Sequence, residues 1–380
     1  MNHLLILLSA FIYGGSSFGF SLKKTCPPSF ELRDRECHLA SLYQLYSSPH
    51  GKGVGSLRTA LPQHRGGYSP EQIDLGRYLF FDPILSKDKS MSCASCHKPE
   101  LGFSDGMPRS TGLNGELLPR SAPSLWNVGF LKKLFWDARS SSLETQAKGP
   151  LFHPNELGHN AEALTTSLAS HKAYRELFEQ AFPKMQSITI DQVTTALAAF
   201  QSSLISLNSR YDRYAHGYSH ALTEPELKGL NIFRSFVARC AECHTPPLFT
   251  NQQIAVIGVP PPEDLPFDIG AEKTFQKPML RGGFKVPSLR NIAHTAPYMH
   301  AGQFKTLHEA VRFYTSGRGH AVPEGERLYI HWHIWEPQLS DIEIDRLVDF
   351  LKTLSDETFM PEIPQRVPSG LPIGNRKVSH

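Results

Sequence analysis

The sequence predicts a mostly α-helical protein with two domains related by duplication and with long loops. First, the pattern C-x-x-C-H occurs twice, at residues 93–97 and at residues 240–244. Second, an apolar pattern with helical spacing leads into each copy. Third, sustained alternation of apolar and polar residues, which would indicate β-strands, is scarce. A chain of 380 residues is long enough for two cores, and its net charge of +3 gives no case for a nucleic acid or an anionic membrane as partner.

Two thiols followed at once by an imidazole form the pattern of covalent haem attachment. The cysteine sulfurs form thioethers with the porphyrin edge, and the histidine supplies an axial nitrogen to iron. A disulfide or a zinc half-site would not require the adjacent histidine, and with six cysteines in 380 residues chance would rarely supply one match. We therefore expect two covalently bound haem c groups, held by Cys93, Cys96 and His97 and by Cys240, Cys243 and His244.

The N-terminal region indicates export. Residues 4–15 are apolar and small residues follow, so residues 1–20 are expected to be a signal peptide, and the run is too short to form a stable membrane span. Covalent haem attachment also favours a periplasmic location. Cys26 and Cys37, in an extension over residues 21–66, most simply form a local disulfide after export, although free thiols or a metal site with His38 remain open.

Helix signals precede both haem sites. Ser69 is a candidate N-cap, and the proline and apolar residues after it predict a helix over residues 69–80. Residues 223–233 repeat this plan. Helical spacing also predicts a core-facing helix over residues 190–214 and a closing helix over residues 341–354.

These helices and haem sites divide the chain into two cytochrome c-like domains. We expect the first domain at residues 67–217 and the second at residues 218–380. The tail beyond Pro361 is rich in proline and is expected to run extended over the surface.

The residues over about 72–354 carry a recognisable resemblance. The chain resembles the bacterial di-haem cytochrome c peroxidase and MauG family. The resemblance implies an enzyme, a peroxidase whose N-terminal haem meets hydrogen peroxide and whose C-terminal haem passes or stores electrons. Besides the haem sites, the matching stretches are residues 75–82, 135–137, 143–147, 286–291 and 295–300.

The resemblance also names catalytic residues. Glu156 matches the family's acid/base, the group that moves a proton between the two peroxide oxygens. Gln146 and Pro150 match residues on the same side of that haem. Trp136 matches the tryptophan between the two haems, where an indole can relay an electron. On the residues alone, Glu156 could be a solvated loop carboxylate and Trp136 a core residue.

The expected axial ligands favour the MauG-like branch. Many of these peroxidases carry a blocking histidine after the first haem site, but residues 98–152 contain none, which leaves Met107 as the one possible sixth ligand there. Tyr314 stands where ordinary peroxidases have an axial methionine and MauG has a tyrosine. A phenolate would stabilise oxidised iron. The alternative is a structural Tyr314 with Met299 or Met279 as ligand.

Two further features each fit more than one interpretation. The family binds calcium through backbone carbonyls that match Thr295 and Pro297 and through an asparagine, whereas Ser121 stands at that last position and is a poorer ligand. The segment 331–335, H-W-H-I-W, could be a metal site or an entry point for electrons, but packing and hydrogen bonding explain it as well.

The expected partners are hydrogen peroxide and either a small electron donor, a cytochrome c or a cupredoxin, or a protein substrate. The chain is expected to be a monomer or a homodimer. Two rival functions remain: an ordinary cytochrome c peroxidase that detoxifies peroxide, and a di-haem electron-transfer cytochrome without enzyme activity.

Overall fold

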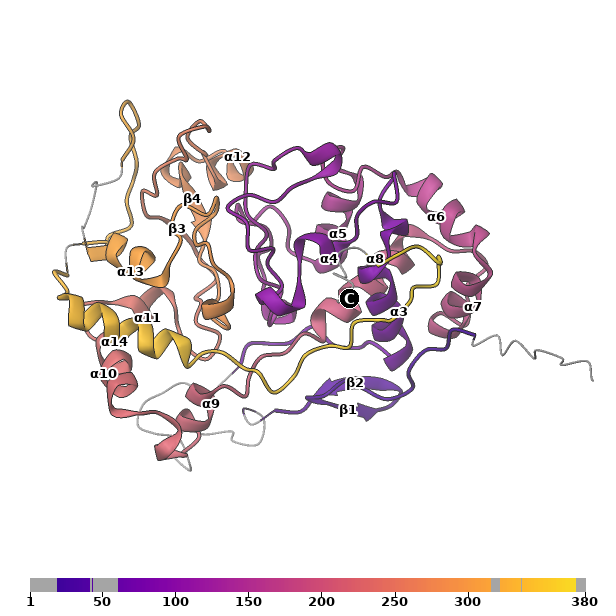
Figure 1. Cartoon of the computed structure of the whole chain (residues 1–380), viewed down its shortest axis with the longest axis horizontal. Helices are drawn as coiled ribbons and strands as arrows, with labels where there is room; N and C mark the ends of the chain where they lie inside the picture. The colour runs from indigo at the N-terminus through magenta and orange to yellow at the C-terminus, as the bar shows by residue number, and fades with distance from the viewer. Residues whose placement is uncertain (1–18, 42, 44–60, 316–321, 336, 374–380) are drawn as a thin grey trace, which may run out of the picture.

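The computed structural model describes residues 19–41, 43, 61–315, 322–335 and 337–373, so almost all of the predicted signal peptide lies outside the described residues. Helices and loops form two lobes that lie side by side (Figure 1). The predicted mostly helical fold is confirmed. Within the described part of the chain, no helix combines the length and the apolar character needed to cross a bilayer.

The first lobe is built from helices on both sides of the first haem-attachment pattern and is preceded by a short hairpin. Its elements are β1 (Phe30–Arg33), β2 (Glu36–Leu39), α3 (Pro70–Phe81), α4 (Cys93–Cys96), α5 (Leu143–Phe152), α6 (Ala161–Ser170), α7 (Lys172–Ala181) and α8 (Ile190–Ser202).

The second lobe repeats this plan and adds one antiparallel strand pair, β3 with β4. Its elements are α9 (Arg210–Ala215), α10 (Glu224–Phe233), α11 (Cys240–Cys243), β3 (Ile254–Val256), α12 (Ala271–Phe275), β4 (Gly283–Lys285), α13 (Leu307–Thr315) and α14 (Asp341–Lys352).

The same close helix crossing occurs in each lobe. A Cβ added at Gly76 of α3 would lie 1.8 Å from the carbonyl oxygen of Ala196 in α8, and one added at Gly229 of α10 would lie 1.9 Å from that of Arg346 in α14. Only a glycine lets each pair of backbones approach so closely. The same contact in both lobes supports duplication.

Aromatic rings pack on these crossings in the same way. Phe80 lies 5.0 Å from Phe200 in the first lobe, and Phe233 lies 5.1 Å from Phe350 in the second, measured between ring centroids. Each glycine therefore stands four residues before the phenylalanine that fills the space beside the crossing.

The predicted helix over residues 190–214 is wrong in its extent. Helix α8 ends at Ser202, and α9 begins after Ser209, whose hydroxyl accepts a hydrogen bond from the backbone N–H of Asp212. Serine side chains compete for backbone hydrogen bonds, which favours caps over helix continuation. The separate helix α9 places Tyr211 and Ala215 in the core of the second lobe.

The C-terminal tail returns to the first lobe, as its course in Figure 1 shows. Val367 is 1% exposed and belongs to the first lobe's core. The Ser369 hydroxyl donates a hydrogen bond to Asp82 at 2.6 Å. The tail is therefore extended, as expected, but part of it is buried rather than spread over the surface.

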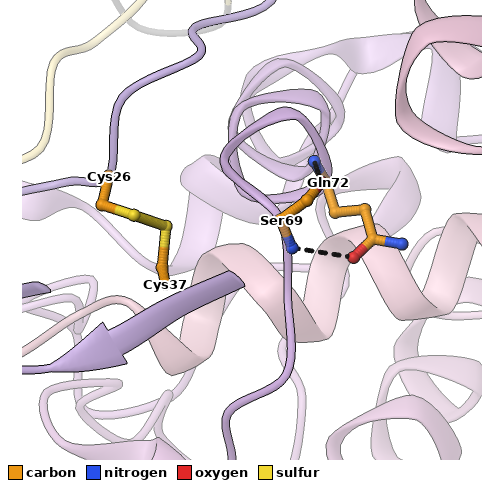
Figure 2. The surroundings of a disulfide bond; sticks show 4 residues. All are labelled: Cys26, Cys37, Ser69 and Gln72. Atoms are coloured by element: carbon orange, nitrogen blue, oxygen red, sulfur yellow. Dashed lines mark hydrogen bonds between the residues drawn. A yellow bond between two sulfur atoms is a disulfide. The ribbon is translucent and has the colours of Figure 1, made fainter. Parts of the chain in front are cut away.

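The predicted disulfide between Cys26 and Cys37 is confirmed. Figure 2 shows it beside the start of α3, where the Ser69 N–H donates to the Gln72 side-chain oxygen at 3.1 Å. The Gln72 N–H in turn donates to the Ser69 hydroxyl at 3.2 Å. This reciprocal cap fixes the start of the helix that leads to the first haem-attachment pattern.

A fully buried ion pair in the second lobe is bonded to a tyrosine of the N-terminal extension. The Arg290 guanidinium donates to the two carboxylate oxygens of Asp212 at 2.6 and 2.7 Å, and the Tyr43 hydroxyl donates to the same carboxylate. Burial acts to raise the pKa of Asp212, but Arg290 outweighs it and the pKa is lowered. The loop before Arg290 is thereby held in place.

Candidate functional site

Both C-x-x-C-H copies fold as one turn of helix followed by a histidine with an oriented ring. The His97 Nδ1 lies 2.8 Å from the carbonyl oxygen of Phe103. The His244 Nδ1 lies 3.1 Å from that of Phe249 and 3.2 Å from that of Pro287. A ring that donates Nδ1–H to a carbonyl keeps Nε2 free to bind a metal.

The protonation states of the histidines and cysteines in the two patterns are also suited to binding haem. Burial lowers the pKa of His97 and of His244, so both imidazoles are neutral, as an iron ligand must be. Burial also raises the pKa of Cys93 and of Cys240 to about 12. Neutral, half-buried thiols are suited to becoming uncharged thioethers, and all four cysteines of the two patterns are free of disulfides.

A second internal repeat surrounds each histidine. Residues 123–127 read P-S-L-W-N and residues 287–291 read P-S-L-R-N. The Ser124 hydroxyl donates to the Gly102 carbonyl at 2.7 Å, and the Ser288 hydroxyl donates to the Leu248 carbonyl at 2.6 Å. The repeated letters are a signal that the sequence reasoning missed, and they fix a common offset of 164 positions (123 to 287) between the lobes.

This offset extends into the next helices. Backbone bridges join Leu134 to Ser140 and Tyr298 to Phe304, and helices α5 and α13 begin at Leu143 and Leu307. The eighth residue of α5 is Pro150, and the eighth residue of α13 is Tyr314. The first lobe therefore has a proline, which offers no ligand atom, where the second lobe has a phenol.

A largely apolar cavity of about 270 Å³ lies against the second attachment pattern. Tyr314 lines it together with Cys240, Cys243 and His244. Burial, and then the charges that the two cysteines would carry as thiolates, raise the pKa of Tyr314. Thioether formation removes the cysteine charges. Met299 also lines this cavity, whereas Met279 is 59% exposed and is not among the lining residues.

Trp136 reaches the same cavity from the first lobe. Its indole N–H donates to the carbonyl oxygen of Ser121 at 2.9 Å, and its own carbonyl accepts from the N–H of Lys285 at 2.8 Å. The ring is thus half-buried at the boundary between the lobes. The position is compatible with both packing and electron relay.

Glu156 lies near the first attachment pattern, in the turn after α5. Its side chain is 29% exposed, and its Oε1 is 4.0 Å from the Nδ1 of His153. The pKa of the Cys96 thiol is raised to about 12, mainly by burial and then by the charges of Asp105 and Glu156. The carboxylate of Glu156 is therefore close enough to Cys96 to affect its ionisation. Burial raises the pKa of Glu156, while His153 and Arg139 act against the rise.

Arg139 is a neighbour of Glu156 that the sequence reasoning missed. Its guanidinium carbon lies 3.4 Å from the Phe135 ring centroid, and it donates to Asp137 at 2.9 Å. The stretch W-D-A-R at residues 136–139 brings the cation close to Trp136 in sequence, but nothing in those letters reveals the turn that directs it to Glu156.

The predicted site residue Gln146 lies on helix α5, and the candidate ligand Met107 lies at the surface. Gln146 is half-buried on α5, one turn before Pro150. Met107 is 46% exposed and lines a separate surface pocket with Pro260 and Phe304.

The three candidate calcium residues are brought together. Ser121, Thr295 and Pro297 all line the cavity that Trp136 reaches. The Ser121 hydroxyl donates to the carbonyls of Met299 at 3.1 Å and His300 at 3.3 Å, which leaves its lone pairs available to a cation.

The chain matches known proteins over most of its length. The family model described as di-haem cytochrome c peroxidase matches residues 70–220. The methylamine utilization protein MauG of Methylorubrum extorquens is 36% identical over 300 residues, which are 78% of this chain and 82% of that protein. The cytochrome c551 peroxidase of Nitrosomonas europaea is 34% identical over 305 residues, which are 79% of this chain and 86% of that protein.

The chain belongs to the di-haem cytochrome c peroxidase family. A solved structure titled as a MauG-like protein associated with microbial copper homeostasis has a TM-score of 0.72 at 32% identity and covers 80% of this chain and 96% of its own. The di-haem peroxidase BthA of Burkholderia thailandensis has a TM-score of 0.65 at 26% identity and covers 94% of this chain. The predicted resemblance, two haem c cofactors and peroxidase activity are confirmed, and the chain is a di-haem peroxidase of the MauG-like branch.

The segment 331–335 lies at the edge of the same cavity in this di-haem peroxidase. Trp335 and His333 line it, and Trp332 is 61% exposed. The Arg239 guanidinium stacks over the Trp332 and Trp335 rings, 5.7 and 4.8 Å from their centroids. Among the residues that the structure describes, no three His, Cys, Asp or Glu side chains gather as a metal site would need.

Proposed function

We propose that this di-haem peroxidase reduces hydrogen peroxide at a haem attached through Cys93 and Cys96 and bound by His97. The other haem is attached through Cys240 and Cys243 and is bound by His244 and Tyr314. The first haem supplies an iron that binds and reduces peroxide. The two domains are proposed at residues 67–217 and 218–380, with α9 at the end of the first range packing into the core of the second lobe.

The observation that carries the proposal is the pair of residues at one structural position, Pro150 in α5 and Tyr314 in α13. The pyrrolidine ring of Pro150 has no donor atom for iron and would leave room for peroxide at the first haem site. The phenol of Tyr314 would supply an oxygen ligand at the second site, which would stabilise oxidised iron. The absence of histidine from residues 98–152 agrees with the open face.

Glu156 moves the proton that this reduction needs. Its carboxylate accepts a proton from one peroxide oxygen and returns it to the other, so that the departing oxygen leaves as water. Reduction of one peroxide to two waters consumes two electrons and two protons. The raised pKa of Glu156 brings the carboxyl nearer to the working pH and makes it the better donor for the second half of the transfer. Gln146, on the adjoining helix, helps to orient the peroxide.

Trp136 would carry electrons between the two haem sites. The indole lines the second-site cavity and is fixed by its hydrogen bond to Ser121, which supports a relay role. The electrons come from a small redox protein, a cytochrome c or a cupredoxin, or from the side chains of a protein substrate. A calcium ion bound by Ser121, Thr295 and Pro297 would stabilise this region between the haems.

The protein works in the periplasm after removal of residues 1–20. The disulfide between Cys26 and Cys37 supports this location, because such bonds persist in oxidising compartments.

The experiment compares Glu156→Gln with Glu162→Gln, a control at an exposed position on α6. We expect the first variant to lose ~10²- to 10⁴-fold in peroxide turnover with both haems still attached, which is the usual contribution of acid–base catalysis. The control should keep wild-type turnover. Unchanged turnover in Glu156→Gln would refute the role.

The resting ferric protein gives a second test. One high-spin haem with an open face is expected in its electron paramagnetic resonance spectrum. Two low-spin six-coordinate haems and no reaction with peroxide would instead indicate an electron-transfer cytochrome. Rapid turnover with reduced cytochrome c would favour detoxification, whereas a near-infrared charge-resonance band after peroxide addition would favour electron sharing between the haems.

A further inference from the structure

Lys285, at the end of β4, is a buried cation without a counter-charge. It is 8% exposed and lines the cavity at the second attachment pattern. No hydrogen bond or ion pair of its ammonium group is found within the described part of the chain. Its pKa is lowered to about 8, with burial as the sole cause, which means that no neighbouring carboxylate offsets the loss of hydration.

An unpaired ammonium in such a place is costly. Moving a charged group out of water costs several kcal/mol unless a counter-ion and hydrogen bonds compensate for it. The backbone of Lys285 bonds to Trp136, and Asp137 is the next residue in the chain. Asp137 pairs with Arg120 and Arg139, however, and does not line the cavity. Among the described residues that line the cavity, none supplies a compensating carboxylate, so a molecule bound there is the candidate for it.

The lining of the cavity is complementary to an anion. Among the described residues that line it, the arginine and the lysine are cationic side chains and none is an aspartate or glutamate. The other titratable groups are histidines, tyrosines and cysteines. The lining residues concerned are Arg239, Lys285, His244, Tyr298, His300, His333, Tyr314, Cys240 and Cys243.

The cation is specific to the second lobe. At the common offset between the lobes, the position that matches Lys285 is Ser121, which is uncharged. The positive charge of Lys285 is therefore present at the second haem site, whereas the matching position of the first lobe holds a neutral serine.

We propose that Lys285 binds a propionate carboxylate of the haem attached at Cys240 and Cys243. Haem carries two such carboxylates, and it is the anionic molecule that the two cysteines hold against this cavity. The proposal rests on the assignment of haem to this site and not on peroxide chemistry. The ammonium neutralises one carboxylate and so raises the reduction potential of the second haem, because a positive charge opposes the oxidised iron.

The test measures the reduction potentials of both haems in the holoprotein by spectroelectrochemistry. Lys285→Met removes the charge, Lys285→Arg keeps it, and Lys277→Met removes a charge from an exposed position shortly before β4. We expect Lys285→Met to lower the potential of the second haem only, with wild-type values in the other two variants. No change, or a change confined to the first haem, would overturn the proposal.

Two further experiments use the wild-type protein and so do not depend on the folding of a variant. A carboxylate partner raises the pKa of Lys285 above the value of about 8 set by burial, so the potential should stay constant from ~7 to ~9 in pH. His300, with a pKa lowered by burial to about 4, stays neutral throughout this range. A potential that falls through pH ~8 would contradict the pairing.

The second experiment separates a haem carboxylate from a free anion. If acetate or chloride were the partner, the bound anion would cancel the ammonium charge, and the potential of the second haem would fall as their concentration rises at constant ionic strength. A potential that is independent of both anions supports the haem carboxylate, and dependence on either refutes it. A protein with two haems and the expected potentials but without peroxidase activity would refute the proposed function and leave this proposal standing.

Discussion

The close helix crossing of the second lobe predicts that Gly229→Ala destabilises the protein. The added Cβ would lie 1.9 Å from the carbonyl oxygen of Arg346 and 2.8 Å from the Cβ of Phe350. Ordinary contact begins at 3.4 Å, so α10 and α14 must separate by about 1.5 Å, the difference between 3.4 and 1.9 Å. A backbone carbonyl cannot rotate aside as a side chain can.

The magnitude follows from two opposing effects. Overpacking of a core costs typically ~1–3 kcal/mol, and a contact with backbone belongs at the upper end. Replacing a helix-interior glycine with alanine returns about 1 kcal/mol of helix propensity. The net loss of about 2 kcal/mol corresponds to a fall of about 4–8 °C in the melting temperature of a lobe of this size.

The assay is thermal unfolding of the holoprotein followed by far-ultraviolet circular dichroism, with haem content measured in parallel. Gly66→Ala is the control, because a Cβ at Gly66 meets nothing within 4 Å. It should melt like the wild type. If Gly229→Ala melted at or above the wild-type temperature, the two helices would not cross as closely as described.

Two further predictions concern the candidate site. Burial raises the pKa of Glu156, and its ionised form accepts the first proton. The value of kcat/KM for peroxide should therefore fall on acidification at a pH above ~4.3, the usual glutamate pKa, and this fall should be absent in Glu156→Gln. A fall centred at the usual pKa would contradict the effect of burial. Tyr314→Met should raise the reduction potential of the second haem, since a thioether stabilises reduced iron, and an unchanged potential would exclude Tyr314 as ligand.

Local patterns predicted much of this molecule because they report on neighbouring residues. The start of α3 at Ser69 and the disulfide between Cys26 and Cys37 depend on contacts within a few residues, and both were predicted. The break between α8 and α9 was missed because apolar spacing continues to Leu207. Long-range packing decided that α9 joins the second core and that Val367 returns to the first.

The sequence by itself determined the cofactor chemistry and the family. Two C-x-x-C-H copies specify where haem is fixed, because attachment needs only residues that are adjacent in the chain. The tertiary structure decided the environment of each haem. It gave Pro150 and Tyr314 equivalent positions, brought Glu156 near Cys96, and buried Lys285 in a cavity whose described lining includes no carboxylate. Burial and charge balance depend on segments far apart in the chain, so no local pattern contains them.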